Sequence, residues 1–192
     1  MKRVLHFAMI ALAVLLLPMQ GHAAEPVRYK LVNERSTLKF FAIKDKLPLQ
    51  GRFSEFSGEA TIDAEKRDIL TLKAEVKTGS IVLEDATLLG NVKKPDWLSV
   101  DAFPTASFEA EKLNRVPGSS NYYGDGSMTI RGKKIPATIN LLLEQDDDDK
   151  VIARGYFTLR RSQFGLGQGE WAKDDVLKDE VRVEFRVVAV KA

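Results

Sequence analysis

Histidine and cysteine are the most informative absences in this sequence of 192 residues. There is no cysteine, and the only two histidines, His6 and His22, lie in an N-terminal segment that we expect to be removed. The rest of the chain therefore lacks Ser–His–Asp and Cys–His nucleophile systems, and it lacks the side chains that usually bind zinc, copper or haem. Disulfides are excluded too, so stability must come from an ordinary hydrophobic core. We predict no cofactor and no metal site.

The N-terminal segment has the pattern of a secretory signal peptide. Lys2 and Arg3 precede an unbroken apolar run, Phe7–Met19, and small residues follow at Ala23 and Ala24. This order of a basic region, a short apolar run and a small-residue cleavage site predicts removal after Ala23 or Ala24, with Ala23 preferred. Residues 1–23 are therefore expected to be the leader, and the protein to be exported to the periplasm.

Long hydrophobic runs are absent beyond the leader. A transmembrane helix needs about 20 consecutive apolar residues, and no stretch after residue 24 approaches this length. The leader run itself is short for a span, so we favour a cleaved signal over the alternative of an uncleaved membrane anchor. We expect residues 24–192 to form one domain without an integral membrane segment.

Excess charge of either sign is also absent from the expected mature chain. The whole sequence has 29 Lys and Arg against 27 Asp and Glu, and two of the bases, Lys2 and Arg3, belong to the leader. The remainder is formally neutral and has no basic field that would attract a phosphate backbone. We predict no nucleic-acid partner.

Alternation of apolar and polar residues is the pattern present almost everywhere else. Residues 70–77 (LTLKAEVK) and 181–191 (VRVEFRVVAVK) place apolar side chains at every second position, which is typical of half-buried strands. About eight to ten such strands, separated by short turns, predict an all-β chain that forms an antiparallel sandwich or barrel. Only Glu84–Leu98 breaks the pattern; there we predict a short helix, interrupted at Gly90 and Pro95, that covers one end of the sheet.

The segment 155–171 (GYFTLRRSQFGLGQGEW) is the most specific in the chain. It begins as a strand and ends in a corner with a glycine at every second position from Gly165, where the backbone can turn sharply. Arg161 shares a strand face with Phe157 and Leu159 and is predicted to point inward, where a buried guanidinium needs a carboxylate or an anionic ligand group as its partner. A barrel corner without any ligand role is the alternative.

Other polar clusters give weak evidence for chemistry. The run Asp146–Lys150 is typical of a solvated hairpin tip, because calcium loops interleave acids with glycines and carbonyl ligands. The carboxylates near residues 174–180 include no pair marked as buried, as glycoside hydrolysis would require. No Ser-x-x-Lys motif stands at a helix start. We therefore predict no catalytic residue and a protein that is not an enzyme.

Five short segments follow one another along the chain: STLKF (36–40), GRFSEFSG (51–58), FPTASF (103–108), MTIRG (128–132) and RSQFG (161–165). In these segments and their order the chain resembles the YceI-like family of periplasmic polyisoprenoid-binding proteins. The resemblance implies a lipocalin-like antiparallel barrel of about eight strands, a short helical insertion in the middle, and a long apolar ligand inside. The family often carries an Arg-Asp-x-x-Leu stretch near the end of that helix, where this chain has ATLLGNVKKPDWL, so no head-group contact is carried over from it.

From these features we expect a periplasmic carrier whose partner is an isoprenoid or quinone-like lipid. Arg161 is expected to meet the polar head. Two alternatives stay open: a stress-related interaction protein whose barrel is filled by its own side chains, and an enzyme that acts on a small apolar substrate through Tyr, Lys or carboxylate groups. The oligomeric state is also open, with a homodimer as one option. The residues expected to line the cavity are Phe40, Phe53, Leu72, Phe108, Ile130, Phe157 and Phe164.

Overall fold

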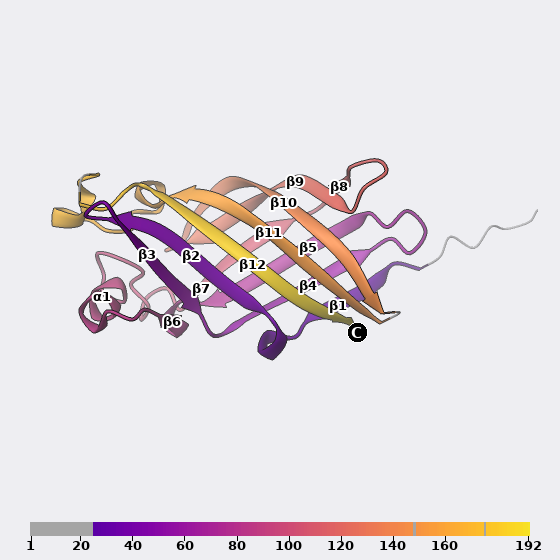
Figure 1. Ribbon diagram of the computed structural model, residues 1–192, viewed down its shortest axis with the longest axis horizontal. Coiled ribbons are helices and arrows are strands. Elements are labelled where there is room, and N and C mark those ends of the chain that lie inside the picture. Colours follow the sequence, from indigo (N-terminus) through magenta and orange to yellow (C-terminus); the bar gives the residue numbers. More distant parts are fainter. Residues whose placement is uncertain (1–24, 148, 175) are drawn as a thin grey trace, which may run out of the picture.

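The computed structural model describes residues 25–147, 149–174 and 176–192, and the predicted leader lies outside this range. Twelve strands form one antiparallel sheet around a hydrophobic interior (Figure 1). The strands of the first half are β1 (Val27–Leu31), β2 (Thr37–Lys44), β3 (Leu47–Phe53), β4 (Phe56–Ile62), β5 (Ile69–Lys77) and β6 (Ile81–Val82). Those of the second half are β7 (Thr105–Ala110), β8 (Asn114–Arg115), β9 (Asn121–Ile130), β10 (Lys133–Asp147), β11 (Lys150–Arg160) and β12 (Glu180–Lys191).

The sheet closes into a barrel of eight strands. The order β1-β4-β5-β7-β9-β10-β11-β12 becomes a ring because β12 also pairs with β1, with Tyr29 opposite Lys191. The other half of β12 pairs with β2, where Val183 lies opposite Phe40, and β3 and β6 follow beyond β2. The predicted all-β antiparallel barrel is confirmed. Closure leaves the ring without an exposed strand edge.

Side-chain hydrogen bonds hold the connection between β1 and β2 against the connection between β3 and β4 and against β12. The 3₁₀ turn η1 (Asn33–Arg35) interrupts the first pair of strands. Asn33 Nδ2 donates to the Ser54 carbonyl (2.9 Å), and Asn33 Oδ1 accepts from the Phe56 N–H (3.0 Å). The Ser36 hydroxyl donates to Val32 and accepts from the Val188 N–H. These bonds satisfy backbone groups that the interrupted ladder leaves without a strand partner.

One α-helix, α1 (Ala86–Val92), lies at the end of the barrel that also carries the β2–β3 hairpin (Figure 1). Asp85 caps it by accepting hydrogen bonds from the N–H groups of Thr87 (2.8 Å) and Leu88 (3.0 Å). The predicted helix is present but shorter than Glu84–Leu98. The predicted interruption at Gly90 is wrong, because a glycine weakens a helix by only about 1 kcal/mol relative to alanine, and this helix continues through it.

Three further 3₁₀ turns complete the chain, and two of them shape the corner that follows β11. They are η2 (Thr78–Ser80), η3 (Arg161–Phe164) and η4 (Gly169–Ala172). Gly165 and Gly167 adopt left-handed backbone angles, with φ near +70°, which explains the glycine spacing of this segment. In the part of the chain that the structure describes, no helix has the length and apolar character needed to cross a membrane.

Candidate functional site: an apolar cavity inside the barrel

A cavity of about 320 Å³ lies inside the barrel. Its volume falls at the lower end of the range of roughly 300–1,000 Å³ that is typical of ligand pockets. Inward-facing residues from most strands form its wall, as the period-2 alternation requires. On β12, for example, the inward-facing side chains are those predicted from the sequence: Val181, Val183, Phe185, Val187 and Ala189.

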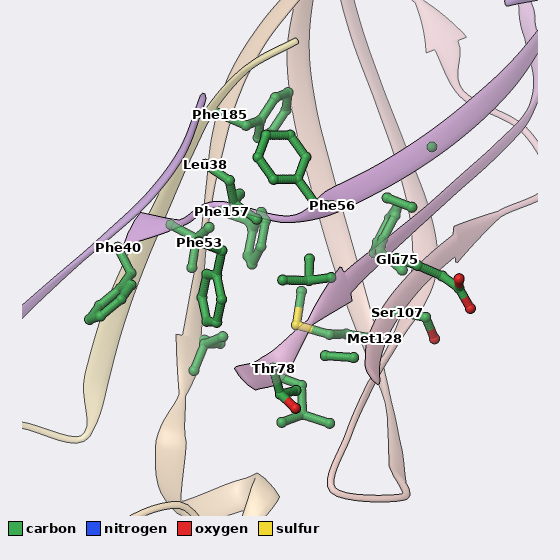
Figure 2. Close-up of a pocket in the computed structure, with 18 of the residues that line it drawn as sticks. Leu38, Phe40, Phe53, Phe56, Glu75, Thr78, Ser107, Met128, Phe157 and Phe185 are labelled. Carbon is green, nitrogen blue, oxygen red and sulfur yellow. The ribbon is translucent and has the colours of Figure 1, made fainter. Parts of the chain in front are cut away.

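The cavity wall combines aromatic and small side chains. Aromatic side chains from β2, β3, β11 and β12 line it, with the Phe40 and Phe53 ring centroids 5.8 Å apart (Figure 2). Gly58 and Ala60 on β4, and Ala74 on β5, are small residues of the same wall. Short side chains leave space that larger side chains would otherwise fill, which helps to keep the barrel hollow.

Three polar side chains along the cavity wall are directed away from its apolar interior or are engaged with the backbone. The Glu75 carboxylate and the Ser107 hydroxyl extend away from the phenylalanine cluster (Figure 2). Thr78 is only 1% exposed, and its hydroxyl donates to the Phe103 carbonyl over 2.7 Å. The cavity therefore offers an apolar surface that suits a hydrocarbon chain.

Tyr122 joins the start of β9 to the loop between β4 and β5. Its side chain is buried, at 3% exposure, and its hydroxyl donates to the Arg67 carbonyl (2.7 Å). Burial raises the pKa of the Tyr122 hydroxyl above its ordinary value, because the charged phenolate would lose its hydration. The phenol thus stays protonated and keeps donating this hydrogen bond.

Replacing Tyr122 with phenylalanine should lower the free energy of unfolding by about 1 kcal/mol at pH 7, the usual value of one hydrogen bond. The raised pKa adds a pH dependence. In the wild type, the contribution is complete below the unfolded-state pKa of about 10 and falls as the pH rises through that value towards the folded-state pKa. The free energy of unfolding of Tyr122→Phe, measured by urea unfolding from pH 8 to 11, should therefore not show the part of the decrease at alkaline pH that the Tyr122 hydroxyl causes in the wild type.

The matched control for this prediction is Tyr123→Phe. Tyr123 is the next residue on β9, faces outward and is 48% exposed. Its replacement should change stability by less than about 0.5 kcal/mol. Equal stability losses in the two variants, or the same alkaline decline in Tyr122→Phe as in the wild type, would contradict the role given to the Tyr122 hydroxyl.

Two tryptophans line the cavity at the α1 end. Trp97, in the loop after α1, and Trp171, in η4, meet edge to face with ring centroids 5.6 Å apart. Leu88 and Val92 of α1 line the same end. Sequence reasoning placed Trp97 with the helix and Trp171 in the glycine-rich corner, but it did not bring them together. Their contact depends on how two segments that are more than seventy residues apart fold over one barrel end.

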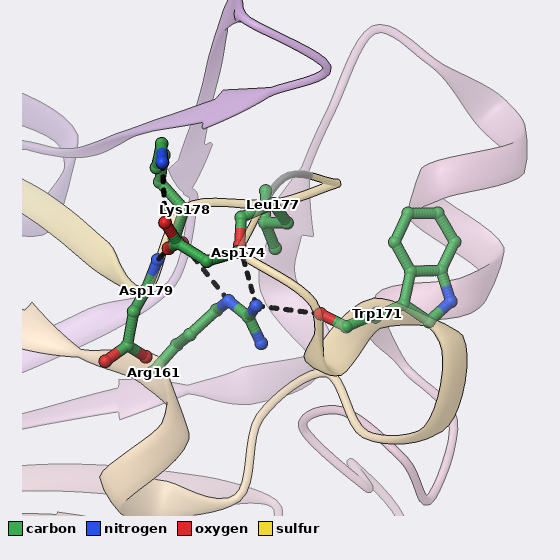
Figure 3. Close-up of polar contacts among 6 residues, drawn as sticks. All are labelled: Arg161, Trp171, Asp174, Leu177, Lys178 and Asp179. Carbon is green, nitrogen blue, oxygen red and sulfur yellow. Dashed lines mark hydrogen bonds and ion pairs between the residues drawn. The ribbon is translucent and has the colours of Figure 1, made fainter.

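Arg161 is buried in the corner after β11, at 3% exposure. Its five hydrogen bonds all go to backbone carbonyl groups, and Figure 3 shows those to Trp171, Leu177 and Lys178. Nε donates to Lys178; Nη1 donates to Leu166 and Gly167; Nη2 donates to Trp171 and Leu177, at distances of 2.7–3.1 Å.

These contacts correct the expectation for the partner of Arg161. Its partner is neither a carboxylate nor a ligand head group, because a guanidinium has five N–H donors and all five are used within the loop. Burial lowers the pKa of the Arg161 guanidinium, while the charges of Asp179 and Asp174 act in the opposite direction. The side chain borders the cavity, but its donors hold the corner loop together.

The nearby carboxylates hold the same loop. Asp179 accepts from the Ser162 N–H and Asp174 accepts from the Asp179 N–H, both over 2.9 Å. Asp174 also accepts from Lys178 Nζ (2.5 Å), and this contact is the main cause of a lowered pKa for the Asp174 carboxyl (Figure 3). Each carboxylate is thus engaged with a backbone N–H or an ammonium group, an arrangement that builds a loop rather than an acid–base pair.

Of the eight site residues predicted from the sequence, six are apolar residues on the cavity wall, and the seventh, Arg161, borders the cavity but binds the corner loop. Phe164 is 2% exposed and belongs to the core, but it does not line the cavity. β11 ends at Arg160, so the alternation of a strand no longer applies to the residues that follow. Side chains in a 3₁₀ turn lie on the same face every three residues, and η3 therefore buries Phe164 together with Arg161. The six wall residues are Phe40, Phe53, Leu72, Phe108, Ile130 and Phe157.

The acidic tip between β10 and β11 is organised by one lysine. Lys150 Nζ lies 2.6 Å from Asp146 and 2.8 Å from Asp147, and its hydrogen bond is the main cause of a lowered pKa for the Asp147 carboxyl. Within residues 25–147, 149–174 and 176–192, no group of three or more acidic side chains is arranged to hold a metal ion.

Comparison with known proteins places this architecture in a family. The YceI-like domain matches residues 29–189. This chain belongs to the YceI-like family. A UPF0312 protein of Pseudomonas aeruginosa (strain LESB58) is 29% identical over 123 residues, which cover 62% of this chain and 63% of that protein. The match therefore spans less than two thirds of the length of this YceI-like relative.

Solved structures share the YceI-like fold. BcnA from Burkholderia cenocepacia superimposes with a TM-score of 0.77 at 25% identity, over 83% of this chain and 99% of BcnA. A polyisoprenoid binding domain from Saccharophagus degradans, implicated in plant cell wall breakdown, gives a TM-score of 0.68 at 13% identity, over 86% of this chain and 99% of that domain. At this identity the second similarity shows the fold alone.

Proposed function

We propose that this YceI-like protein is a periplasmic carrier that holds a long apolar lipid of the isoprenoid or quinone-like type inside its barrel. The observation that carries the proposal is the cavity of about 320 Å³ with a predominantly apolar wall (Figure 2). The polyisoprenoid binding domain of the same fold supports this ligand class, and the signal-peptide pattern supports export.

The energetics of burial suit transfer between sites. Each buried CH₂ group gains roughly 0.8 kcal/mol relative to water. A lipid that leaves a bilayer gains little of this, because its chain was already out of water. The barrel would therefore shield a lipid during passage through an aqueous compartment and release it again to another apolar site.

The cavity also separates this proposal from its alternatives. An interaction protein with a filled barrel should have no cavity, whereas small residues here leave one open. An enzyme would need reactive groups in the cavity, but Glu75 and Ser107 extend away from it and Arg161 is engaged with carbonyl groups. Binding without chemistry is the function that this wall supports best.

The direct test is native mass spectrometry on protein purified from the exported fraction without detergent, followed by organic extraction. We expect a discrete added mass that extracts as a prenyl lipid or quinone, and a chain that begins at residue 24 or 25. An unliganded mass, with no uptake when such lipids are added, would contradict lipid carriage. Recovery of the chain with its leader would contradict export through a cleaved signal peptide.

A further inference from the structure

The turn of the β2–β3 hairpin exposes apolar side chains at the α1 end of the barrel (Figure 1). Leu47 is 68% exposed, the largest fraction among the large hydrophobic residues that the structure describes, and Ile43 is 46% exposed. Pro48, which lies opposite Ile43, is exposed as well. Single exposed apolar residues are ordinary on a protein surface, but three together at one tip indicate contact with another apolar phase.

Strand pairing places these side chains on both faces of the tip. Ala42 and Leu49 lie opposite each other and line the cavity, so their neighbours Ile43 and Pro48 face outward. Leu47 lies on the same face as Leu49 but closer to the turn, where its side chain extends into solvent. The inner face of the hairpin thus continues the cavity wall beyond the end of the barrel.

The backbone of this tip is held by the corner segment that follows β11. The Asp45 N–H donates to the Val176 carbonyl, and the Lys178 N–H donates to the Ile43 carbonyl, both over 2.9 Å. The exposed side chains are therefore carried on a backbone that is ordered before any partner arrives, and this lowers the entropic cost of binding.

Lys46 adds a positive charge beside Leu47. Lys46 is exposed and forms no ion pair with any residue that the structure describes, whereas Lys44 is paired with Asp45. Its φ of +67° is a backbone conformation that glycine adopts more readily than lysine. The turn keeps a lysine at a cost in conformation, which points to a use for its charge. An ammonium group next to exposed aliphatic side chains fits the phosphate groups of a membrane surface.

A bilayer suits this tip better than a protein partner does. A specific protein interface buries about 800 Å² on each side, usually around aromatic anchors. The tip offers only two aliphatic side chains, a proline and a lysine. A bilayer accepts so small a surface, because its apolar interior receives each side chain separately and its anionic lipids attract the ammonium group. Such binding is weak and reversible, as a carrier requires.

We propose that the tip of the β2–β3 hairpin, formed by Ile43, Lys46, Leu47 and Pro48, docks the protein on an anionic phospholipid bilayer. This inference rests on the proposed function and names the surface that the carrier meets. The aliphatic side chains enter the boundary between head groups and acyl chains, and Lys46 contacts lipid phosphates. Leu49 of the same hairpin lines the cavity, so docking brings the cavity wall next to the membrane that supplies or receives the lipid.

The test is cosedimentation of the exported protein with sucrose-loaded vesicles of phosphatidylcholine alone, or of phosphatidylcholine and phosphatidylglycerol in equal parts. The wild type should prefer the anionic vesicles. Leu47→Ser should bind them about tenfold more weakly, because it loses the most exposed aliphatic side chain. Lys46→Gly should bind the anionic vesicles about fivefold more weakly and the neutral vesicles as the wild type does, since the loss is electrostatic.

Val116→Ser is the matched control, because Val116 is an exposed aliphatic residue in the loop between β8 and β9. It should change vesicle binding by less than twofold. All three variants should keep the thermal midpoint of the wild type. They should also keep its affinity for a prenyl benzoquinone in solution, measured by displacement of the neutral fluorescent probe N-phenyl-1-naphthylamine. Transfer of this quinone between anionic vesicles should be slower for Leu47→Ser and Lys46→Gly alone.

The outcomes separate this inference from lipid carriage. A wild type that binds neither kind of vesicle but still binds the quinone would overturn docking and leave carriage intact. Equal losses in Leu47→Ser and Val116→Ser would overturn the role of the tip. Vesicle binding without quinone binding would support docking and contradict lipid carriage. A wild-type dimer that Leu47→Ser dissociates, seen by analytical ultracentrifugation without vesicles, would assign the tip to a second copy of the chain instead.

Discussion

Replacing Arg161 with lysine should lower the free energy of unfolding by about 3 kcal/mol. Lysine keeps the positive charge, but its ammonium group has three donors on one atom and cannot reach carbonyl groups spread around a planar guanidinium. At least two of the five carbonyl groups then lose their partner, and each unsatisfied buried group costs roughly 1–3 kcal/mol. Urea unfolding followed by tryptophan fluorescence measures the change.

Two control variants should lose less stability and more stability, respectively, than Arg161→Lys. Arg160→Lys changes the preceding, exposed residue in the same way and should alter stability by less than about 0.5 kcal/mol. Arg161→Met removes all five donors and should destabilise more than Arg161→Lys. A lysine variant as stable as Arg160→Lys would show that the loop does not depend on these hydrogen bonds.

Filling the cavity should abolish lipid binding while the barrel stays folded. Ala74 is one of the small residues of the cavity wall, with Gly58 opposite it on β4 and Phe108 opposite it on β7. Ala74→Phe places a phenyl ring in space that the ligand chain would occupy. We expect at least a tenfold loss of affinity for a prenyl benzoquinone, which corresponds to a loss of about 1.4 kcal/mol or more in binding free energy. Displacement titrations measure the affinity, and thermal unfolding reports on the fold.

Thr71→Phe provides the matched control on the same strand. Thr71 is exposed on the outer face of β5, so its replacement should change affinity by less than twofold. Ala106→Leu, also on the cavity wall, is a smaller filling change in case Ala74→Phe overpacks the interior. Unaltered binding in folded Ala74→Phe and Ala106→Leu proteins would place the ligand outside the barrel.

Strong alternation in the sequence was sufficient to predict the strands and their inward faces. Residues 70–77 and 181–191 lie in β5 and β12, and Leu72, Ala74 and Val76 of β5 face inside as predicted, since successive side chains in a strand point to opposite faces. At the start of β5 the prediction for Leu70 is wrong, because a register shift puts Ile69 in the cavity wall instead. The same rule placed Phe40 and Phe157 on the cavity wall. It failed for Phe164, because η3 follows a different repeat from the strand before it.

The sequence by itself determined most of the barrel strands, the polarity of their two faces, and the absence of cysteine and, after residue 22, of histidine. Only the tertiary structure decided that the barrel is hollow, because the free space depends on which side chains the paired strands bring together in its wall, such as Ala74 between Gly58 and Phe108. It also decided the partners of Arg161 and the exposure of Leu47. Hydrogen bonds and cavities are set by the approach of distant segments, and local periodicity carries no information about that approach.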